Sequence, residues 1–277
     1  MSTLFIVGTP IGNLGDITLR ALEVLRSADL ILCEDTRTTR NLLVKYDIAT
    51  KTMSYHAHSK ISRAEEIIGL LKEGKNLALV SDAGTPGVSD PGSELVKRVR
   101  EECAEEMARG ELRIESIPGP SALTAALSIA GVPCSDFTFL GFLPHKKGRE
   151  TLFKEIANSE RTMIFYESPH RIMKTLESLV KCLEVGIRQP RLEPTLPETS
   201  LSSFAKATED KGGAERLMAR GGNVSATGVV KSKKVTVCRE LTKIFEEVIS
   251  GSANEVKEYF ESHPDKIRGE FVVIIGE

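Results

Sequence analysis

SDAGTPGVSDPG, residues 81–92, directly follows the apolar run LALV at residues 77–80 and precedes a long helical pattern. Apart from Val88, every residue in it is Gly, Pro, Ser, Thr, Ala or Asp. Glycine and proline control backbone geometry, and such a loop exposes peptide N–H and C=O groups to a small ligand. A simple connection between a strand and a helix would not require this control. The stretch therefore predicts a strand, loop and helix whose loop binds a small ligand of the adenosine type, mainly through backbone groups.

On both sides of this loop, short apolar strands alternate with helical patterns. We expect strands at residues 3–7, 30–33, 52–55, 77–80 and 112–117, and helices at about 17–28, 38–45, 62–72 and 93–109. In the first of these helices, Leu22, Leu25 and Ala28 share one face at three- and four-residue spacing. Strands that are apolar throughout and separated by helices predict a mostly parallel sheet covered on both faces.

Pro118-Gly119-Pro120 interrupts the alternation, because two prolines around a glycine continue neither a strand nor a helix. We place a domain boundary there, with one α/β domain at residues 1–117 and another at 118–277, which suits a chain of 277 residues. In the second part we expect helices at 121–130, 148–158 and 169–184, and strands at 137–142, 162–166, 235–237 and 271–275. The fold class is α/β, with each sheet mixed or parallel and flanked by helices.

Residues 187–232 are the one stretch without this pattern. They hold Pro190, Pro194 and Pro197, two Gly-Gly pairs and many Ser and Thr residues, with few large apolar side chains to build a core. A loop of this length is unusual inside a compact domain. We predict a flexible insertion at about 187–232, and a functional recognition loop is the alternative.

The charges are nearly balanced, with 37 Lys and Arg against 39 Asp and Glu and a formal net charge of -2. This argues against binding nucleic acid through an overall positive field. Cations still cluster locally, at Arg37 and Arg40, at 146–149, and at His170 and Arg171. For any nucleic-acid partner, the balance therefore predicts few phosphate contacts, a shallow salt dependence, and recognition by shape rather than by bulk electrostatics.

The chain shows no sign of export or membrane insertion. No apolar run approaches the ~18 residues of a membrane span, and residues 1–8 lack the basic start of a signal peptide, so we expect a cytoplasmic protein without a membrane partner. The five cysteines are scattered singly without a C-x-x-C pair, so neither a disulfide framework nor a metal site is indicated. Buried thiols are expected instead.

Other polar motifs of the first part also follow strands. GTPIGNLGD at 8–16 lacks both the G-x-G-x-x-G spacing and a Walker lysine, which leaves either ligand contact or a structural turn. EDTR at 34–37 places two carboxylates beside an arginine, either to cap the next helix or to bind a substrate hydroxyl. IPGPSA at 117–122 ends in a serine that can cap a helix beside a cleft.

The second part repeats this arrangement. FLGFLPHKKGR at 139–149 ends a strand in a basic cluster, which is either solvated surface or a phosphate site. FYESPHR at 165–171 supplies a carboxylate, an imidazole and a guanidinium, and RELTK at 239–243 follows a late strand. Because the motifs of both parts all follow strands, a shared site is favoured over ordinary loop chemistry.

In order and spacing, GTPIGNLGD, EDTR, SDAGTPGVSDPG, IPGPSA, FLGFLP, FYESPHR, RELTK and GEFVVII resemble the tetrapyrrole methylase superfamily, in its branch that methylates small-subunit ribosomal RNA. The resemblance covers residues 1–184 and 234–277, and departs from the family at 187–232 and in a somewhat longer 101–110. It implies S-adenosyl-L-methionine in a cleft between the two domains, and a homodimer. The implied activity is methyl transfer to the ribose 2'-hydroxyl of a cytidine in the decoding region of 16S rRNA, within the small ribosomal subunit.

Carried over motif by motif, the resemblance implies cofactor contacts by Thr9, Pro10, Asp82, Ala83, Gly84, Thr85, Pro86, Gly87, Ser121, Ala122, Tyr166, Glu167 and Leu241. Since a 2'-hydroxyl is a poor nucleophile until it loses its proton, we hypothesise that Glu167 or Asp35 accepts that proton. The cations expected at the RNA are Arg37, Lys146, Lys147, Arg149, His170 and Arg171.

Two other functions compete with this one. A methylase of the same fold can act on a tetrapyrrole or another small molecule, and a chain of this fold can bind S-adenosyl-L-methionine without catalysis. The intact glycine- and proline-rich loops argue against the second alternative.

Overall fold

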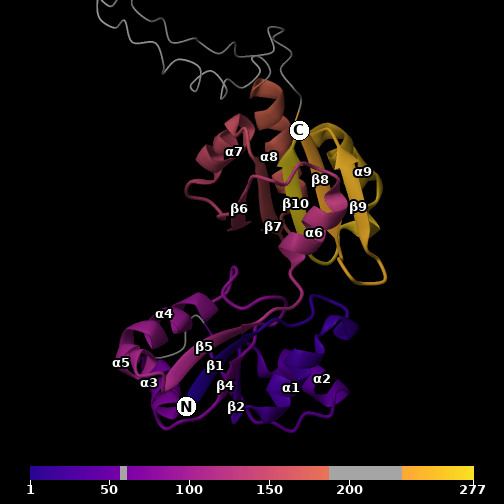
Figure 1. Cartoon of the computed structure of the whole chain (residues 1–277). Helices are drawn as coiled ribbons and strands as arrows, with labels where there is room; N and C mark the ends of the chain where they lie inside the picture. Colours follow the sequence, from indigo (N-terminus) through magenta and orange to yellow (C-terminus); the bar gives the residue numbers. More distant parts are fainter. Residues whose placement is uncertain (57–60, 187–232) are drawn as a thin grey trace, which may run out of the picture.

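The strands of the chain form two five-stranded sheets, seen in Figure 1 as two lobes. The structure, a computed structural model, describes residues 1–56, 61–186 and 233–277. The sheet of the N-terminal lobe has the order β3-β2-β4-β1-β5 and is parallel throughout. The sheet of the C-terminal lobe has the order β6-β7-β10-β8-β9 and is mixed. The α/β fold class predicted from the sequence is confirmed.

The N-terminal lobe carries helices on both faces of its sheet. Its elements are β1 (Ser2–Val7), η1 (Leu14–Asp16), α1 (Leu19–Ser27), β2 (Leu30–Cys33), α2 (Thr36–Lys45), β3 (Thr52–Ser54), α3 (Ile61–Lys72), β4 (Leu77–Leu79), α4 (Gly92–Glu102), α5 (Ala104–Ala108) and β5 (Leu112–Ile117). One core cluster packs α1 and α2 on the sheet through Leu25 and Leu42, and another packs α3 and α4 on the opposite face through Ile67 and Leu95. The single helix expected at 93–109 is wrong, because the backbone of Cys103 leaves helical geometry between α4 and α5.

The C-terminal lobe covers its sheet unequally. Its elements are α6 (Ala122–Ala130), β6 (Phe137–Phe142), α7 (Arg149–Asn158), β7 (Thr162–Glu167), α8 (Ile172–Gly186), β8 (Lys234–Arg239), β9 (Glu247–Gly251), α9 (Ala253–Ser262), η3 (Pro264–Lys266) and β10 (Phe271–Gly276). Helices α7, α8 and α9 pack on one face around Phe165 and Phe260, and α6 covers the other face through Ala126. Strand β9 and helix α9 were not expected from the sequence.

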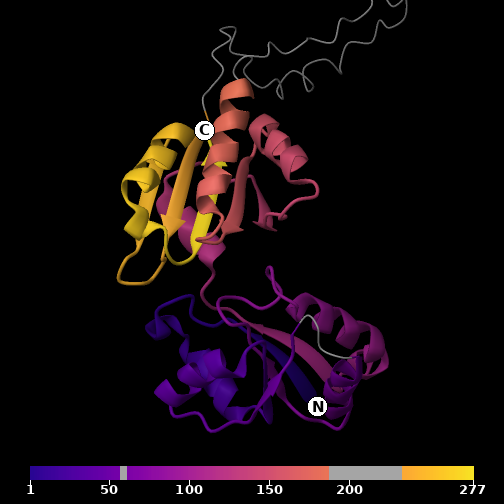
Figure 2. The same ribbon diagram turned by 180° about the vertical axis from the view of Figure 1, so that it is seen from behind.

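The two lobes are stacked end to end and joined by the chain between β5 and α6, as Figures 1 and 2 show from opposite sides. They also touch beside this connection: the amide of Asn13 donates to the hydroxyl of Thr242 at 3.1 Å, and Ile11 packs in the core cluster of α6. Two sheets need not be two independently folding units, so the boundary at 117/118 stays a prediction. The insertion predicted at 187–232 lies outside the described residues.

The cysteines only partly follow expectation. Cys33, Cys103 and Cys238 are buried free thiols, as expected, whereas Cys134 is exposed and Cys182 is half-buried. No helix in the described ranges is both long and apolar enough to cross a membrane. The same ranges hold no cluster of three or more His, Cys, Asp or Glu side chains arranged for a metal ion.

Strand directions bring both sheets to the same place. The parallel strands of the N-terminal lobe all end at one edge, where ligands of open α/β sheets bind. In the C-terminal lobe, β6 and β7 run parallel, while β10 runs antiparallel to β7 and to β8. The ends of β6, β7 and β8 and the start of β10 therefore share one edge. The two edges face each other across the connection between the lobes.

Candidate functional site

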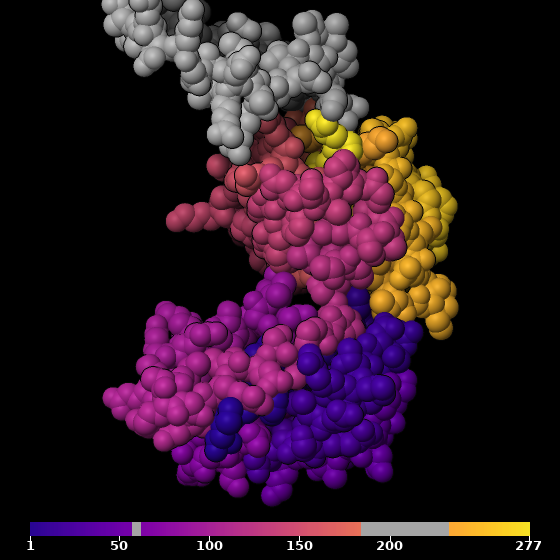
Figure 3. Space-filling model, viewed as in Figure 1, coloured from indigo at the N-terminus to yellow at the C-terminus, as the bar shows by residue number. Residues whose placement is uncertain are grey.

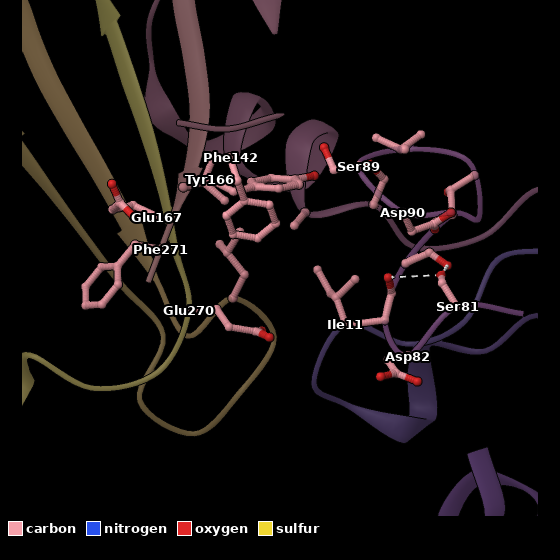
Figure 4. A pocket seen from close by; sticks show the side chains of 18 of the residues that line it. Ile11, Ser81, Asp82, Ser89, Asp90, Phe142, Tyr166, Glu167, Glu270 and Phe271 are labelled. Carbon is pink, nitrogen blue, oxygen red and sulfur yellow. Dashed lines mark hydrogen bonds between the residues drawn. The ribbon is translucent and has the colours of Figure 1, made fainter. Parts of the chain in front are cut away.

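A cavity of about 420 Å³ lies between the facing edges, within the range of small-molecule sites. Figure 3 shows the hollow between the lobes, and Figure 4 shows the cavity from close by. The N-terminal lobe and the connection contribute Ile11, Glu34, Ser81, Asp82, Ala83, Gly84, Thr85, Val88, Ser89, Asp90, Ser121 and Ala122. The C-terminal lobe contributes Phe142, Tyr166, Glu167, Ser168, Pro169, Leu241, Glu270, Phe271 and Val272.

The loop after β4 is held open by the loop after β1. The backbones of Thr9 and Gly84 exchange two hydrogen bonds, of 2.9 and 3.1 Å. The buried hydroxyl of Thr9 donates to the carbonyl of Ser81 at 3.1 Å. Gly84 has a φ of 80°, which glycine adopts without strain. Thr9 thus supports the loop after β4 by hydrogen bonds and does not itself line the cavity.

Pro118-Gly119-Pro120, the hinge between the two lobes, crosses the loop after β1 at very short range. A Cβ atom on Gly8 would stand 2.8 Å from the backbone of Gly119, so glycine is required for this approach. The hinge then delivers Ser121, whose side chain makes no capping hydrogen bond to α6. Ser121 and Ala122, at the start of α6, both line the cavity.

The two carboxylates that follow β2, Glu34 and Asp35, have different surroundings. Asp35 caps α2, accepting from the amide of Arg37 at 2.8 Å and from its guanidinium at 2.7 Å. These contacts lower the pKa of Asp35 from 3.8 to about 2. Its own amide donates to the carboxylate of Asp82 at 3.0 Å. Asp35 is thus a capping residue, and it is not among the residues lining the cavity.

Glu34, one position earlier, does line the cavity. Burial raises the pKa of Glu34 above its usual 4.5, the carboxylates of Asp82 and Asp90 raise it further, and His56 acts in the opposite direction. Glu34 is thus a stronger base than Asp35, whose pKa is about 2.

Aromatic rings form the opposite wall. Phe142 and Tyr166 meet edge to face at 5.4 Å between ring centroids, and Phe139 packs on Tyr166 in the same way at 4.9 Å. Phe142 is 58% exposed, whereas Tyr166 is half-buried and its pKa is raised by burial. In Figure 4 these two rings face Ser89 and Asp90 of the N-terminal lobe.

Glu167 is the centre of a buried ion-pair network. Its carboxylate accepts from the Arg171 guanidinium at 2.7 Å and from the Thr175 hydroxyl at 2.7 Å, and lies 3.9 Å from the Arg149 guanidinium. The side chain is fully buried, and in Figure 4 it points away from the loops of the N-terminal lobe. Arg171 also donates to the carbonyl of Leu143, and Arg149 to that of Pro144. The network therefore fixes the loop that follows Phe142, and both oxygens of Glu167 are occupied.

The predicted cofactor residues are only partly gathered in the cavity. Its lining includes Asp82, Ala83, Gly84, Thr85, Ser121, Ala122, Tyr166, Glu167 and Leu241. Thr9, Pro10, Pro86 and Gly87 lie outside this lining: Thr9 braces the loop, Pro10 is buried, Pro86 borders a small adjoining cavity, and the amide of Gly87 donates to Asp90 at 2.7 Å. Their predicted cofactor contacts, like those of the lining residues, stay predictions.

The cations predicted at the RNA fall into two groups. Lys146, Lys147 and His170 are exposed, and Arg37 is 89% exposed beside Asp35. Arg149 and Arg171 instead have side chains only 11% and 17% exposed, and both turn inward to Glu167. Their contact with RNA stays a prediction, and the structure assigns them internal partners.

Sequence reasoning missed several lining residues, among them Glu34, Asp90, Phe142 and Glu270. Each lies in a motif singled out above: Glu34, Asp90 and Phe142 lie at or after strand ends, and Glu270 directly precedes β10, so position at the end of a strand was the available signal. Asp35, one of the two hypothesised proton acceptors, is not among the lining residues, because as the cap of α2 its side chain accepts from the amide of Arg37; its role as proton acceptor stays a prediction.

The cavity has the electrostatics of a site for a cation. Its lining includes five acidic residues, Glu34, Asp82, Asp90, Glu167 and Glu270, and none of its lining residues is Lys or Arg. Glu167 is paired with arginine and Glu270 lies 3.4 Å from the ammonium of Lys243, but Glu34, Asp82 and Asp90 have no Lys or Arg partner in the lining and leave an excess of negative charge. A sulfonium-bearing ligand suits this lining better than a nucleotide polyphosphate does.

Comparison with known proteins agrees with this architecture. Residues 3–192 match the family model "Tetrapyrrole (Corrin/Porphyrin) Methylases". The chain is 38% identical over 276 residues to "Ribosomal RNA small subunit methyltransferase I" of Thermotoga maritima, covering 100% of this chain and 99% of that protein. It is 47% identical over 197 residues to the protein of the same name from Vibrio cholerae, covering 71% of this chain and 65% of that one.

Solved structures share the fold at low sequence identity. The methyltransferase CobJ superposes with a TM-score of 0.57 at 18% identity, covering 100% of this chain and 93% of that one. Cobalt precorrin-4 methyltransferase, a cobalamin biosynthetic enzyme, gives a TM-score of 0.53 at 15% identity, covering 99% of this chain and 94% of that one. At such identities the likeness concerns the fold alone.

Proposed function

The chain belongs to the tetrapyrrole methylase family, in its ribosomal RNA small subunit methyltransferase I branch, and we propose that it methylates the ribose 2'-hydroxyl of a cytidine in the decoding region of 16S rRNA, using S-adenosyl-L-methionine. Membership makes the chain a methyltransferase, and the named relatives act on small-subunit rRNA. The observation that carries the finer proposal is the acidic cavity between the lobes, which two sets of strand-end loops line.

The residues of the cavity fit the cofactor. Backbone groups around Gly84 and the start of α6 suit an adenosine, and the carboxylates of Asp82 and Asp90 suit a sulfonium. When bound, the cofactor supplies an electrophilic methyl group for in-line attack, so alignment by the protein contributes several kcal/mol. The protein then holds the ligand between two walls of the cavity. One wall is the loop braced by Thr9, and the other is the aromatic pair Phe142 and Tyr166.

We propose Glu34 as the group that accepts the proton of the ribose hydroxyl. It faces the cavity and its pKa is raised, whereas Asp35 caps α2 with a pKa of about 2 and Glu167 is saturated with donors. The earlier hypothesis of Glu167 or Asp35 thus gives way to the neighbouring carboxylate. Glu167 acts in this scheme as a positioning residue, through Arg171 and the loop after Phe142.

Replacing Glu34 tests this assignment. We expect Glu34→Gln to lower the single-turnover rate by about 10²–10⁴-fold, because the amide cannot take the proton. Cofactor affinity should fall far less than the rate, because Asp82 and Asp90 keep their charges in the lining. The rate of the unchanged protein should fall as the pH is lowered through the pKa of Glu34, which lies above 4.5. Glu23→Gln, an exposed carboxylate of α1, is the control. An unchanged rate in Glu34→Gln would return the assignment to Glu167 or Asp35.

One assay separates the proposed function from its alternatives. Radiolabelled S-adenosyl-L-methionine is incubated with small ribosomal subunits that lack the modification, and any 2'-O-methyl group is mapped. Transfer to one cytidine of 16S rRNA supports the proposal. Transfer to a free macrocycle with indifference to subunits identifies a small-molecule methylase, and cofactor binding without transfer identifies a non-catalytic protein.

The proposal includes an assembly and a location. We propose a homodimer acting on the small subunit in the cytoplasm, as the resemblance of the motifs implies. Light scattering of the purified chain tests the dimer, since a mass near 30.3 kDa would show a monomer. Methylation of assembled subunits compared with protein-free 16S rRNA tests which of them is the substrate.

A further inference from the structure

A second groove lies on the N-terminal lobe, between α2 and the edge strand β3. Its volume is about 390 Å³, close to that of the cavity between the lobes. It is lined by Thr36, Arg37, Arg40, Leu43, Val44, Ile48, Thr50, Lys51 and Thr52. Apart from Arg37, which the resemblance places at the RNA, the proposed methyl transfer gives none of these residues a role, so the groove needs its own explanation.

The lining combines cations with hydroxyl groups. Arg37, Arg40 and Lys51 contribute three positive charges, and none of the lining residues is acidic. Arg40 and Lys51 form no ion pair within the part of the chain that the structure describes, and both side chains are exposed. Cations without a counter-charge, beside threonine hydroxyls, are the groups that contact phosphate and sugar in nucleic-acid complexes.

The local sequence explains why the charges share one face. In α2, Arg40 lies four residues after Thr36, three before Leu43 and four before Val44, so Arg40 shares one side of the helix with these three residues. Leu43 packs inward on the sheet, which leaves Arg40 on the rim of the groove. Lys51 arrives from the other side, immediately before β3.

The groove begins at the wall of the cavity between the lobes. Glu34 lines that cavity, the amide of Asp35 donates to Asp82 of the same lining at 3.0 Å, and Thr36 lines the groove. Since consecutive Cα atoms lie about 3.8 Å apart, Glu34 and Thr36 are separated by no more than about 7.6 Å. Although the cavity and the groove share no lining residue, a polymer that places one sugar in the cavity therefore lies close to the end of the groove at Thr36.

We propose that the groove between α2 and β3 binds the phosphodiester backbone of the RNA strand next to the methylated nucleotide, with Arg40 and Lys51 contacting phosphates. This inference rests on the proposed function, since it takes the occupant of the cavity to be a ribose of RNA. The nearness of Thr36 to the cavity wall and the absence of acidic residues from the groove lining favour a polyanionic chain over a free anion. Arg37 contributes less, because Asp35 already neutralises it.

The test compares charge removal in the groove with charge removal elsewhere. Arg40→Gln with Lys51→Gln removes two groove cations; Lys97→Gln with Arg100→Gln removes two exposed cations of α4, on the opposite face of the sheet. The KM for small subunits and the salt dependence of binding to a protein-free decoding-region RNA fragment are measured for each. Thermal unfolding and cofactor binding establish that every variant is folded.

We expect the groove variant to raise KM roughly tenfold and to reduce the salt slope for the RNA fragment by about 1.4, or 0.7 for each single-strand phosphate contact. Its kcat should stay within about twofold, because the reacting groups are untouched. Arg40→Lys with Lys51→Arg should restore most of the affinity, since the charges return. The α4 variant should resemble the unchanged protein in all three measurements.

Several outcomes would overturn the inference. An unchanged KM and slope would remove the groove from RNA binding, and an equal loss in the α4 variant would show only a general effect of charge. A raised KM for subunits with unaltered binding to the protein-free fragment would identify a ribosomal protein as the contact. If the unchanged protein does not methylate subunits at all, the proposed function fails first, and only the binding measurement then addresses the groove.

Discussion

The two walls of the cavity are built by different physical means. On the N-terminal side, loops rich in glycine and proline hold their shape by backbone hydrogen bonds, such as the pair between Thr9 and Gly84. On the C-terminal side, a fully buried carboxylate, Glu167, orders the wall through two arginines. The stability of the N-terminal wall should therefore be sensitive to added side-chain volume, and that of the C-terminal wall to the loss of a charge. Substitutions of either kind should therefore affect the two walls very differently.

The largest effect is expected from removing the charge of Glu167. Glu167→Gln leaves Arg171 and Arg149, both largely buried, without their counter-charge, and breaking a buried pair in this way costs about 3–5 kcal/mol. The free energy of unfolding is measured by urea denaturation. Because the loop after Phe142 loses its anchor, cofactor affinity should fall as well.

A matched control exists on the surface. Glu66 pairs with Arg63 at 2.7 Å, the same distance as the Glu167 pair, but both side chains are more than 40% exposed. Glu66→Gln should change the free energy of unfolding by less than about 1 kcal/mol. If the two variants lose similar amounts, burial of the network does not govern the C-terminal wall.

The N-terminal wall should respond to volume instead. Gly8→Ala places a Cβ atom 2.8 Å from the backbone of Gly119, so the loop and the hinge must separate. We expect a loss of about 1–3 kcal/mol in the free energy of unfolding, together with weaker cofactor binding, measured by calorimetry.

The control for Gly8 has the opposite expected sign. Gly69 lies inside α3, where an added Cβ atom meets nothing within 4 Å. Gly69→Ala should stabilise the chain by roughly 0.5–1 kcal/mol, because alanine is the better helix former. If Gly8→Ala left the free energy of unfolding unchanged while Gly69→Ala raised it, the backbone around Gly119 would have room to accommodate the added Cβ atom.

Much of the site follows from strand ends that the sequence reveals. Apolar runs such as residues 77–80 predict strands, and parallel strands gather the loops that follow them at one edge. The position of the glycine-rich loop at the cavity was therefore predictable. The role of Glu167 was not: its partner Thr175 lies eight residues away, and only the packing of α8 on β7 makes the carboxylate fully buried.

Other omissions had readable signals. Helix α9 begins with a complete capping box of Ser252 and Glu255, the S-x-x-E pattern that marks a helix start. The break between α4 and α5 carries no such mark, since Cys103 is neither glycine nor proline. Glu34 lines the cavity and Asp35 caps α2. Both directly follow β2, so strand-end position alone does not distinguish these adjacent carboxylates.

The smallest effect sharpens the comparison, because Asp35 and Arg37 form an exposed counterpart of the Glu167 pair. Asp35→Asn keeps a good helix cap but removes the charge. Folding lowers the pKa of Asp35 from 3.8 to about 2, so its charge stabilises the folded state above pH 3.8, and that contribution is lost as the pH falls towards 2. The difference in urea midpoint between Asp35→Asn and the unchanged protein should thus be constant from pH 7 to 5 and shrink below pH 4.

Salt at 1 M should nearly abolish this difference in urea midpoint by screening, while leaving most of the loss of stability in Glu167→Gln. Equal salt sensitivity of the two variants would mean that solvent reaches the Glu167 network, and the contrast between the walls would not hold.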